Sequence, residues 1–267
     1  MTRDSLVSLI RDKKSFLCVG LDSDLQRMPD CLSGEKDPVL KFNQEIVAAT
    51  QDLCVAYKPN VAFYESRGAE GWKTLEETMK HIPDEIFTIA DAKRGDIGNT
   101  SKMYAQAFFK NMEFDSVTVA PYMGVDSVAP FLEFNDKWVI LLGLTSNKGS
   151  SDFQMLETGG SKLYEEVITR SQAWGSPDNL MYVIGATHPD KLAQVRALAQ
   201  EFFFLVPGVG AQGGTVADVA GSGMNDEVGL LVNSSRGILY ASDGPDFAEA
   251  AREAALNLKN KMEEFIV

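Results

Sequence analysis

The amino-acid sequence predicts a (β/α)8 barrel, or TIM barrel, formed by a single domain that spans residues 1–267. One observation is a series of eight short, continuously apolar segments, which is typical of strands buried on both faces. A second is that segments with helical periodicity lie between them, with no Pro/Ser-rich linker and no low-complexity segment. The length also agrees, because such barrels contain about 250 residues. A doubly wound open sheet is the alternative, and the count of eight favours closure.

The predicted strands and helices alternate along the chain. The strands are expected at residues 16–21, 53–57, 86–90, 116–120, 139–144, 181–184, 202–206 and 229–232. The helices are expected at residues 38–51, 64–81, 100–110, 126–134, 163–171, 189–200, 215–220 and 247–265. Pro130 is expected to break the helix at 126–134. The polar, Gly/Ser-rich segment 145–160 is expected to be an irregular loop and a candidate lid over a ligand.

Composition and charge exclude several classes of function. The formal net charge of −13 argues against a nucleic-acid-binding surface, which needs clustered Lys and Arg. No apolar stretch approaches the ~18 residues of a membrane span, and the first residues do not resemble a signal peptide. Three cysteines without a secretory signal are typical of a reducing compartment, so a cytoplasmic protein is expected. Any anionic ligand must therefore be bound by a few well-placed cations and backbone amides.

Polar residues follow nearly every predicted strand. In a (β/α)8 barrel the active site is built at the carboxyl ends of the strands, so these residues are the candidates for chemistry. They are Asp22 and Ser23 after the first strand, Lys58 and Asn60 after the second, residues 91–96 after the third, residues 145–147 after the fifth, residues 207–214 after the seventh and residues 233–237 after the eighth.

The segment after the third predicted strand has the densest pattern of charge. Asp91 and Lys93 are two residues apart, so both are expected to point toward the barrel mouth, with Lys58 beside them and Asp96 as a fourth charge. Alternating carboxylates keep each lysine cationic. Each opposite-charge contact contributes about 4 kcal/mol of Coulomb energy at ~4 Å and an effective dielectric constant of ~20. A charge cluster on a surface loop is the alternative interpretation of this spacing.

The segments after the seventh and eighth strands suit a phosphate group, which in this fold usually binds there. Gly208, Gly210 and Gly213 allow backbone amides to approach an anion, and Arg236 can bind it through two hydrogen bonds. The same glycines match the dinucleotide-binding fingerprint, but they come late in the chain and lack the ribose-binding acid after the next strand. The two histidines have no metal-ligand spacing, so no metal site is predicted.

Residues 91–100, DAKRGDIGNT, resemble the signature of the orotidine 5′-phosphate decarboxylase family, in its longer bacterial subgroup. The resemblance continues in the same order through most of the chain, in VGLDS at 19–23, AYKPN at 56–60, LTSN at 144–147, PGVGAQGG at 207–214 and SRG at 235–237. It implies decarboxylation of orotidine 5′-monophosphate to uridine 5′-monophosphate and CO2 in de novo pyrimidine biosynthesis, without a cofactor or a metal.

The resemblance also implies a role for each matching residue. Lys93 would be the proton donor to C6, Asp91 would face the substrate carboxylate, and Lys58 would orient Asp91 and hold the ribose. Asp96, Ile97 and Thr100 would reach into the partner's site, which implies a homodimer with shared active sites. The remaining substrate-binding residues would be Asp22 at the ribose, Ser146 at the pyrimidine, and Pro207, Gln212, Ser235 and Arg236 at the phosphate. One departure is that residues 233–236 read Asn-Ser-Ser-Arg, where many members have an apolar pair and Gly before the Arg.

Two other functions are compatible with part of this pattern. Mg²⁺-dependent barrels that act on sugar phosphates, such as 3-keto-gulonate phosphate decarboxylases and hexulose phosphate synthases, also carry a DxKxxD segment. They need a further acidic ligand, and Asp22 is the only acid at the first two strand ends. A non-catalytic nucleotide-binding barrel is the second alternative. It is disfavoured because all four charged residues are present.

Overall fold

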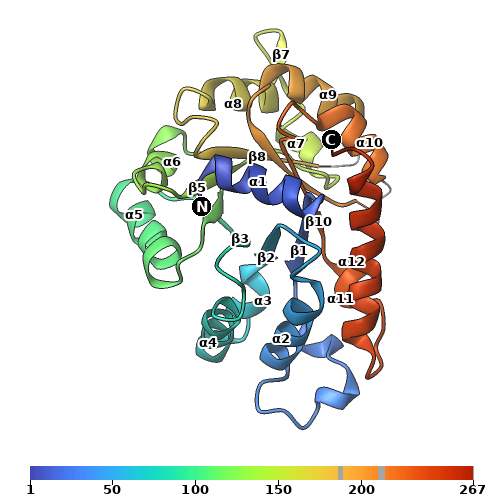
Figure 1. The fold of residues 1–267 in the computed structure, drawn as a ribbon. Helices are drawn as coiled ribbons and strands as arrows, with labels where there is room; N and C mark the ends of the chain where they lie inside the picture. Colours follow the sequence, from blue (N-terminus) through green and yellow to red (C-terminus); the bar gives the residue numbers. More distant parts are fainter. Residues whose placement is uncertain (186–188, 210–213, 267) are drawn as a thin grey trace.

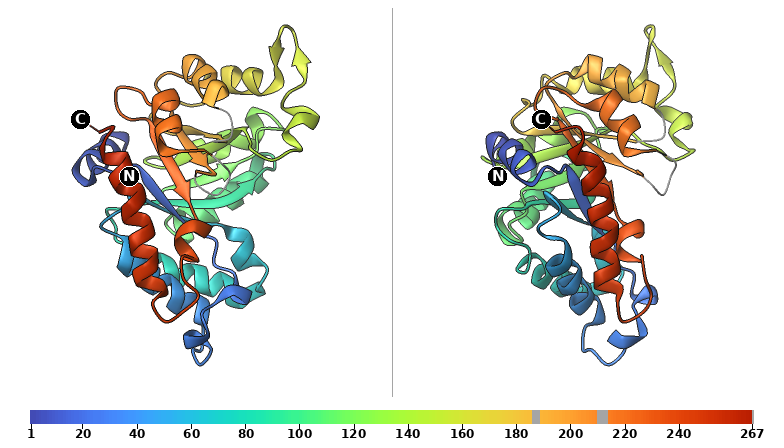
Figure 2. Two further views of the ribbon diagram at one scale, coloured as in Figure 1. Left: turned by 90° about the vertical axis from the view of Figure 1, so that its right-hand side faces the viewer. Right: turned by 45° about the vertical axis from the view of Figure 1, so that its right-hand side comes forward.

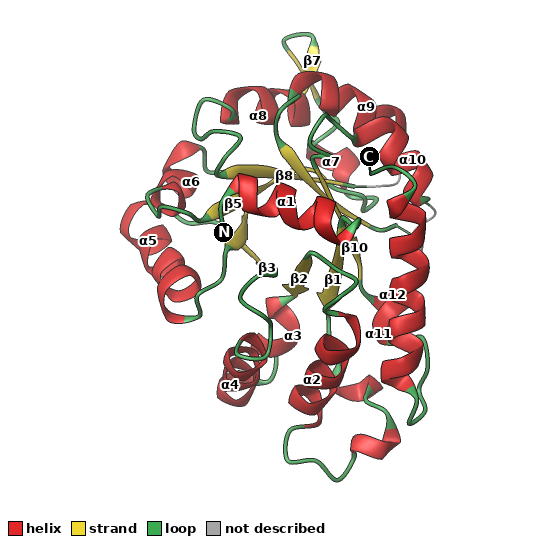
Figure 3. Ribbon diagram, viewed as in Figure 1, coloured by secondary structure: helices red, strands yellow, loops and turns green. Residues whose placement is uncertain are grey.

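The protein was analysed as a computed structural model, which describes residues 1–185, 189–209 and 214–266. Eight parallel strands form a closed barrel, and each strand pairs with its neighbours in chain order (Figure 3). The strands are β1 (Leu17–Leu21), β2 (Ala56–Pro59), β3 (Phe87–Arg94), β4 (Ser116–Val119), β5 (Trp138–Leu144), β8 (Leu180–Ile184), β9 (Phe203–Pro207) and β10 (Leu230–Ser234). The predicted (β/α)8 barrel is therefore confirmed.

Helices surround the barrel as an outer ring (Figure 1). The main ones are α2 (Pro38–Thr50), α3 (Val61–Glu65), α4 (Gly68–Met79), α5 (Gly98–Gln106), α6 (Val125–Leu132), α8 (Leu163–Ser171), α9 (Pro189–Leu198), α10 (Val216–Gly223) and α12 (Phe247–Glu263). Shorter pieces are the 3-10 turns η1 (Leu25–Arg27) and η2 (Asp30–Leu32), the π-helical turn η3 (Ala107–Asn111), α7 (Ser150–Phe153) and α11 (Arg236–Leu239). No helix in the described part of the chain is long and apolar enough to span a membrane.

Two strands differ from their predicted bounds by three or more residues at one end. The second begins at Ala56 rather than at residue 53, because Leu53 still belongs to the turn that ends α2, where its N–H donates to the carbonyl of Thr50. The third continues to Arg94, so the first four residues of the charged segment lie on β3 itself. The pairing of β3 with β4 is irregular there, with a register shift between Ala90 and Arg94.

Two observed helices differ from the predicted ones in their continuity. The helix expected at 64–81 is divided into α3 and α4, and Gly68 at the start of α4 has a left-handed φ of 63°. Pro130 does not break α6 but lies inside it. Pro130 lies in the last turn of this eight-residue helix. Its missing N–H therefore removes one backbone hydrogen bond near the end of the helix.

The amino-terminal end of the barrel is closed by α1 (Arg3–Lys13), which crosses in front of the strands in Figure 1. The amino group of Met1 forms an ion pair of 2.8 Å with Asp115, directly before β4. The indole of Trp138, at the start of β5, donates to the carbonyl of Met1 at 2.9 Å. These contacts tie α1 to the starts of the strands, so ligands reach the barrel from the opposite end.

The segment 145–160, expected to be irregular, contains regular structure. It includes α7 and leads into an antiparallel hairpin of β6 (Glu157–Thr158) and β7 (Ser161–Lys162), which projects from the barrel in both views of Figure 2. The side-chain amide of Gln154 both accepts from the N–H of Thr145 and donates to its hydroxyl, each at 2.8 Å. The base of this segment is therefore anchored to the end of β5, while Phe153 and Leu156 are exposed.

Candidate active site

A network of buried charges lies at the carboxyl ends of β2 and β3. Lys58 is on β2, and Asp91 lies in the neighbouring strand, where it forms a parallel bridge with Asn60. The ammonium of Lys58 donates to Oδ2 of Asp91 at 2.8 Å, and that of Lys93 donates to Oδ1 at 2.6 Å. One carboxylate is therefore held between two lysines. The surface-loop alternative fails at Lys58 and Asp91, because these residues are only 4% and 9% exposed.

Burial and charge act in opposite directions on this network. Burial by itself would lower the pKa of Lys58, but the fields of Asp91 and Asp22 outweigh it and raise the pKa above its ordinary value. Burial would likewise raise the pKa of Asp91, and the two neighbouring lysines instead hold it well below its ordinary value. Lys58 is therefore cationic and Asp91 anionic at neutral pH.

Lys93 has an unusual backbone conformation, with a φ of 47° in the left-handed region. Non-glycine residues adopt this region rarely, and such strain is commonly found at functional sites. Its side chain is 52% exposed, so the ammonium faces the barrel mouth while it contacts Asp91. The sequence placed Asp91 and Lys93 on one face by simple strand alternation. The structure brings them together at an irregular position of the strand.

Asp22 follows β1 and lies beside the network. Its Oδ1 atom is 3.7 Å from the ammonium of Lys58. This oxygen is buried and has no hydrogen-bond partner within the described residues. A buried carboxylate oxygen without a donor is unfavourable, so it can accept a hydrogen bond from a bound ligand at little further cost.

The candidate phosphate-binding residues gather at the ends of β9 and β10. Pro207 ends β9 and pairs with Asn233, and Gly208 beyond it has a φ of 100°. Arg236 begins α11 and is exposed, and its guanidinium makes no hydrogen bond or ion pair within the part of the chain that the structure describes. Gln212 lies outside the described residues.

Ser235 contacts the neighbouring strand β1, where its hydroxyl donates to the carbonyl of Gly20 at 3.1 Å. A Cβ atom at Gly20 would lie 2.5 Å from that hydroxyl, so this position requires glycine. Ser146 follows β5 and lies against Gly185, where a Cβ atom would meet it at 2.8 Å. Both serines are therefore at the carboxyl end of the barrel.

Asp96 does not join the charged network within the described residues. Its carboxylate accepts from the N–H of Ile97 at 2.8 Å, and its backbone carbonyl accepts from the hydroxyl of Ser101. Ile97 and Thr100 are both exposed, and the side chain of Ile97 is 56% exposed despite being apolar. None of these three residues therefore contacts Lys58, Asp91 or Lys93 within the described part of the chain.

The sequence analysis did not identify Thr118, a residue of β4 that contacts both Asp91 and Lys93. Its hydroxyl accepts from the N–H of Lys93 at 2.8 Å and lies 3.2 Å from Oδ1 of Asp91. The available signal was the pair of hydroxyl residues, Ser116 and Thr118, that alternate with valines in the predicted strand. Among the described residues, no group of three or more His, Cys, Asp or Glu side chains is arranged to hold a metal ion.

The fold is a (β/α)8 barrel, and its candidate active site is a set of charges held at the carboxyl ends of the strands. The model of the Orotidine 5'-phosphate decarboxylase / HUMPS family matches residues 15–254. The chain belongs to this family.

Relatives and solved structures agree with that assignment. The orotidine 5'-phosphate decarboxylase of Flavobacterium johnsoniae is 55% identical, with 100% of this chain and 98% of the relative covered. That of Christiangramia forsetii is 57% identical, with 98% and 97% covered. The structure of Leishmania donovani OMP decarboxylase has a TM-score of 0.83 at 38% identity and covers 99% of this chain and 100% of that one. The structure of Leishmania donovani UMP synthase has a TM-score of 0.88 at 40% identity, and this chain spans 56% of its length.

Proposed function

We propose that this protein decarboxylates orotidine 5′-monophosphate to uridine 5′-monophosphate and CO2 in pyrimidine biosynthesis, without a metal or an organic cofactor. The observation that carries the proposal is the network at the mouth of a barrel of this family, in which the buried pair of Lys58 and Asp91 contacts the half-exposed Lys93. Fixed charges are the means that such a reaction needs, because the electron pair left on carbon has no cofactor to accept it.

The chemical step is assigned to Lys93. The bond between C6 and the carboxylate breaks, CO2 leaves, and the electron pair remains on C6. The ammonium of Lys93 stabilises this carbanion and then transfers a proton to C6, after which solvent reprotonates the amine. The ionised carboxylate of Asp91 faces the substrate carboxylate, and Lys58 keeps Asp91 in place through its 2.8 Å ion pair.

The remaining contacts bind parts of the substrate distant from C6. The Oδ1 atom of Asp22, which accepts no hydrogen bond within the described residues, is suited to accept one from a ribose hydroxyl. Ser146 is assigned to the pyrimidine, and the phosphate is assigned to the following residues: Pro207, Gln212, Ser235 and Arg236. Binding energy from these groups lowers the barrier when it organises the charges around the reacting carbon.

The direct test follows the ultraviolet absorbance of orotidine 5′-monophosphate with the purified protein in EDTA. We expect rapid conversion to uridine 5′-monophosphate that EDTA does not change. A protein that is inactive on this nucleotide but decarboxylates a keto-sugar phosphate in Mg²⁺ would contradict the proposal. Binding of the nucleotide without its consumption would instead indicate a non-catalytic barrel.

We also propose a cytoplasmic homodimer with shared active sites, in which Asp96, Ile97 and Thr100 contact the substrate bound by the partner. In support, Ile97 is an exposed apolar residue directly beside Asp96, and the carboxylate of Asp96 makes no contact with the charged network of its own chain among the described residues. Further exposed apolar side chains, those of Met103, Tyr122, Met123 and Val125, occur on α5 and around the start of α6. The three free cysteines agree with a reducing compartment.

Hybrid dimers test the shared site. Lys93→Ala and Asp96→Ala are each expected to abolish turnover as homodimers. Mixing and exchanging the subunits should restore activity, because one site of each hybrid then contains an intact Lys93 and an intact Asp96. If Asp96 serves its own chain, each hybrid site carries one defect and no activity returns. Sedimentation of the unmixed protein as a monomer would also contradict the dimer.

A further inference from the structure

The strand that carries Asp91 and Lys93 is bulged at those residues. Ala90 pairs with Val117 of β4, and the next pair along the strands is Arg94 with Val119. Three residues of β3 therefore lie opposite a single residue of β4, Thr118. Bulges of this kind leave extra backbone groups without partners in the ladder and change the direction of a side chain.

Thr118 supplies the hydrogen bond that the ladder lacks. The N–H of Lys93, which lies within the bulge, donates to the hydroxyl oxygen of Thr118 at 2.8 Å. The ladder resumes one residue later, where the N–H of Ala120 donates to the carbonyl of Arg94 at 2.8 Å. The hydroxyl thus holds the backbone of Lys93 in its left-handed conformation, with a φ of 47°.

The same hydroxyl also reaches the carboxylate. The proton of the Thr118 hydroxyl has two acceptors in reach, Oδ1 of Asp91 at 3.2 Å and the carbonyl of Ala90 at 3.5 Å. The shorter contact is the one to the charged oxygen, and hydrogen bonds to ionised groups are stronger than neutral ones. Oδ1 is also the atom that binds the ammonium of Lys93 at 2.6 Å.

We propose that Thr118 is a positioning residue for the decarboxylation, and that its buried hydroxyl fixes the backbone of Lys93 and the carboxylate of Asp91 relative to each other. This inference rests on the roles proposed above for Lys93 and Asp91. Thr118 is 1% exposed on β4 and its hydroxyl contacts Lys93 and Asp91, so it acts through these two charged residues. A displacement of ~1 Å at such a pair can reduce turnover by about 100-fold.

The test compares Thr118→Val with Thr118→Ser. Valine keeps the shape and the branched Cβ but removes the hydroxyl, whereas serine keeps the hydroxyl and removes a methyl group. We expect Thr118→Val to lower kcat by about 10- to 100-fold with KM within about threefold of the wild type. Thr118→Ser should stay within about threefold of the wild type in both constants. Thr118→Ala provides the same comparison if the valine variant does not fold.

Three outcomes would overturn the inference: a valine variant with wild-type kcat, a serine variant as impaired as the valine variant, or a rise in KM with kcat unchanged. The second would indicate packing of β4 rather than the hydroxyl. Lys93→Ala separates this inference from the function itself. If Lys93→Ala remains active, the proposed role of Lys93 fails. If Lys93→Ala is inactive while Thr118→Val is normal, only the role of Thr118 fails.

Discussion

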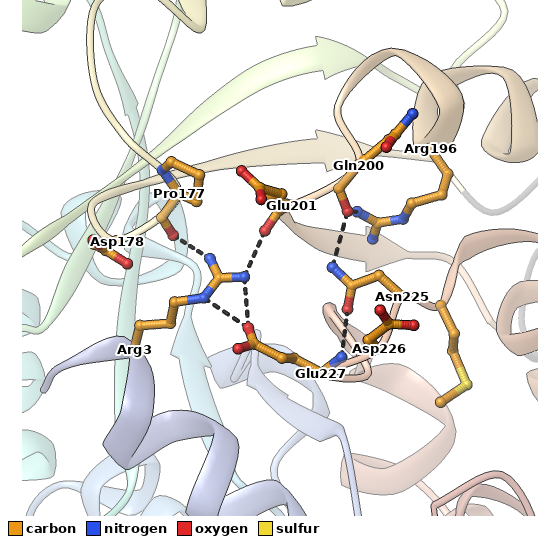
Figure 4. A pocket seen from close by; sticks show the side chains of 10 residues that line it. Arg3, Pro177, Asp178, Arg196, Gln200, Glu201, Asn225, Asp226 and Glu227 are labelled. Carbon is orange, nitrogen blue, oxygen red and sulfur yellow. Dashed lines mark hydrogen bonds and ion pairs between the residues drawn. The ribbon is translucent and has the colours of Figure 1, made fainter.

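The two ends of the barrel both contain buried cations, but they use them differently. At the carboxyl end, Lys58 and Lys93 share the carboxylate of Asp91, and the ammonium of Lys93 is half exposed. At the amino end, a cavity of about 750 Å³ is lined by Arg3 and Arg196 together with loops that precede β8, β9 and β10 (Figure 4). Positive charge therefore occurs at both ends, and neither positive charge nor the cavity at the amino end by itself identifies the active site.

The arginines at the amino end have their donors occupied by the protein. Arg196 donates to five backbone carbonyls, those of Gly223, Ala199, Gln200, Phe202 and Gly229, and lies 3.7 Å from the ring centre of Phe204. Burial, with repulsion from Arg3, lowers the pKa of Arg196 to about 9, so it remains charged at neutral pH. Arg3 joins α1 to Glu227 and to the carbonyls of Pro177 and Glu201 (Figure 4).

The two ends of the barrel differ in how many of their polar groups can still form a hydrogen bond with a ligand. Each nitrogen of these two guanidinium groups donates to a protein acceptor, so both groups connect loops. Within the described residues, by contrast, the Lys93 ammonium binds one carboxylate, the guanidinium of Arg236 has no hydrogen bond or ion pair, and a buried oxygen of Asp22 accepts no hydrogen bond. The carboxyl end is therefore organised for a ligand and the amino end for stability.

The largest expected effect is that of Lys93→Ala. Loss of both the fixed charge and the proton donor should lower kcat by at least about 10³-fold. The fold should be unchanged because this side chain is 52% exposed. Steady-state kinetics and thermal melting measure the two effects, and Lys80→Ala, an exposed lysine at the end of α4, is the matched control. Near-normal turnover of Lys93→Ala would contradict the assignment.

Arg236→Ala should weaken recognition of the phosphate. Loss of charge-assisted hydrogen bonds should reduce kcat/KM for orotidine 5′-monophosphate by about 100-fold. The same constant for orotidine, which lacks the phosphate, should not change. An equal loss on both substrates would show that Arg236 acts on something other than the phosphate.

Arg196→Met tests whether the amino end of the barrel contributes to stability and not to catalysis. Five carbonyls lose their donor, so the free energy of unfolding should fall by about 3 kcal/mol. At a temperature where the variant is folded, kcat and KM should stay within about twofold of the wild type. Denaturant unfolding measures stability, with the exposed Arg170→Met as control. A drop in kcat without a loss of stability would place the amino end in catalysis.

The smallest expected effect is that of pH on the network. The pKa of Asp91 is lowered below its ordinary value of 3.8, so its contribution to stability is present above about pH 4 and lost as pH falls further. The pKa of Lys58 is raised above 10.5, so its contribution is present below that value and lost as pH rises through the folded-state pKa. The stability difference between wild type and Asp91→Asn should therefore be constant from about pH 5 to about pH 9. A change in that difference near pH 6 would contradict these directions.

Most of the fold could be predicted because buried parallel strands are continuously apolar. In addition, the strands of the barrel are neighbours in the order in which they occur along the chain. The end of the third strand was misplaced at Ala90 because local composition does not report the pairing of β3 with β4. The role of α1 was also missed. Arg3 and Met1 act on loops more than 100 residues away, which no local pattern indicates.

The sequence by itself determined the (β/α)8 barrel and placed Lys58, Asp91 and Lys93 at one end of it, because parallel strands carry their carboxyl ends to the same edge. Only the tertiary structure decided how these charges meet. The bulge opposite Thr118, the left-handed backbone of Lys93 and the free oxygen of Asp22 depend on pairing between β3 and β4 and on the approach of β1 to β2. Hydrogen bonds between strands set those positions, and these hydrogen bonds cannot be predicted from residue spacing alone.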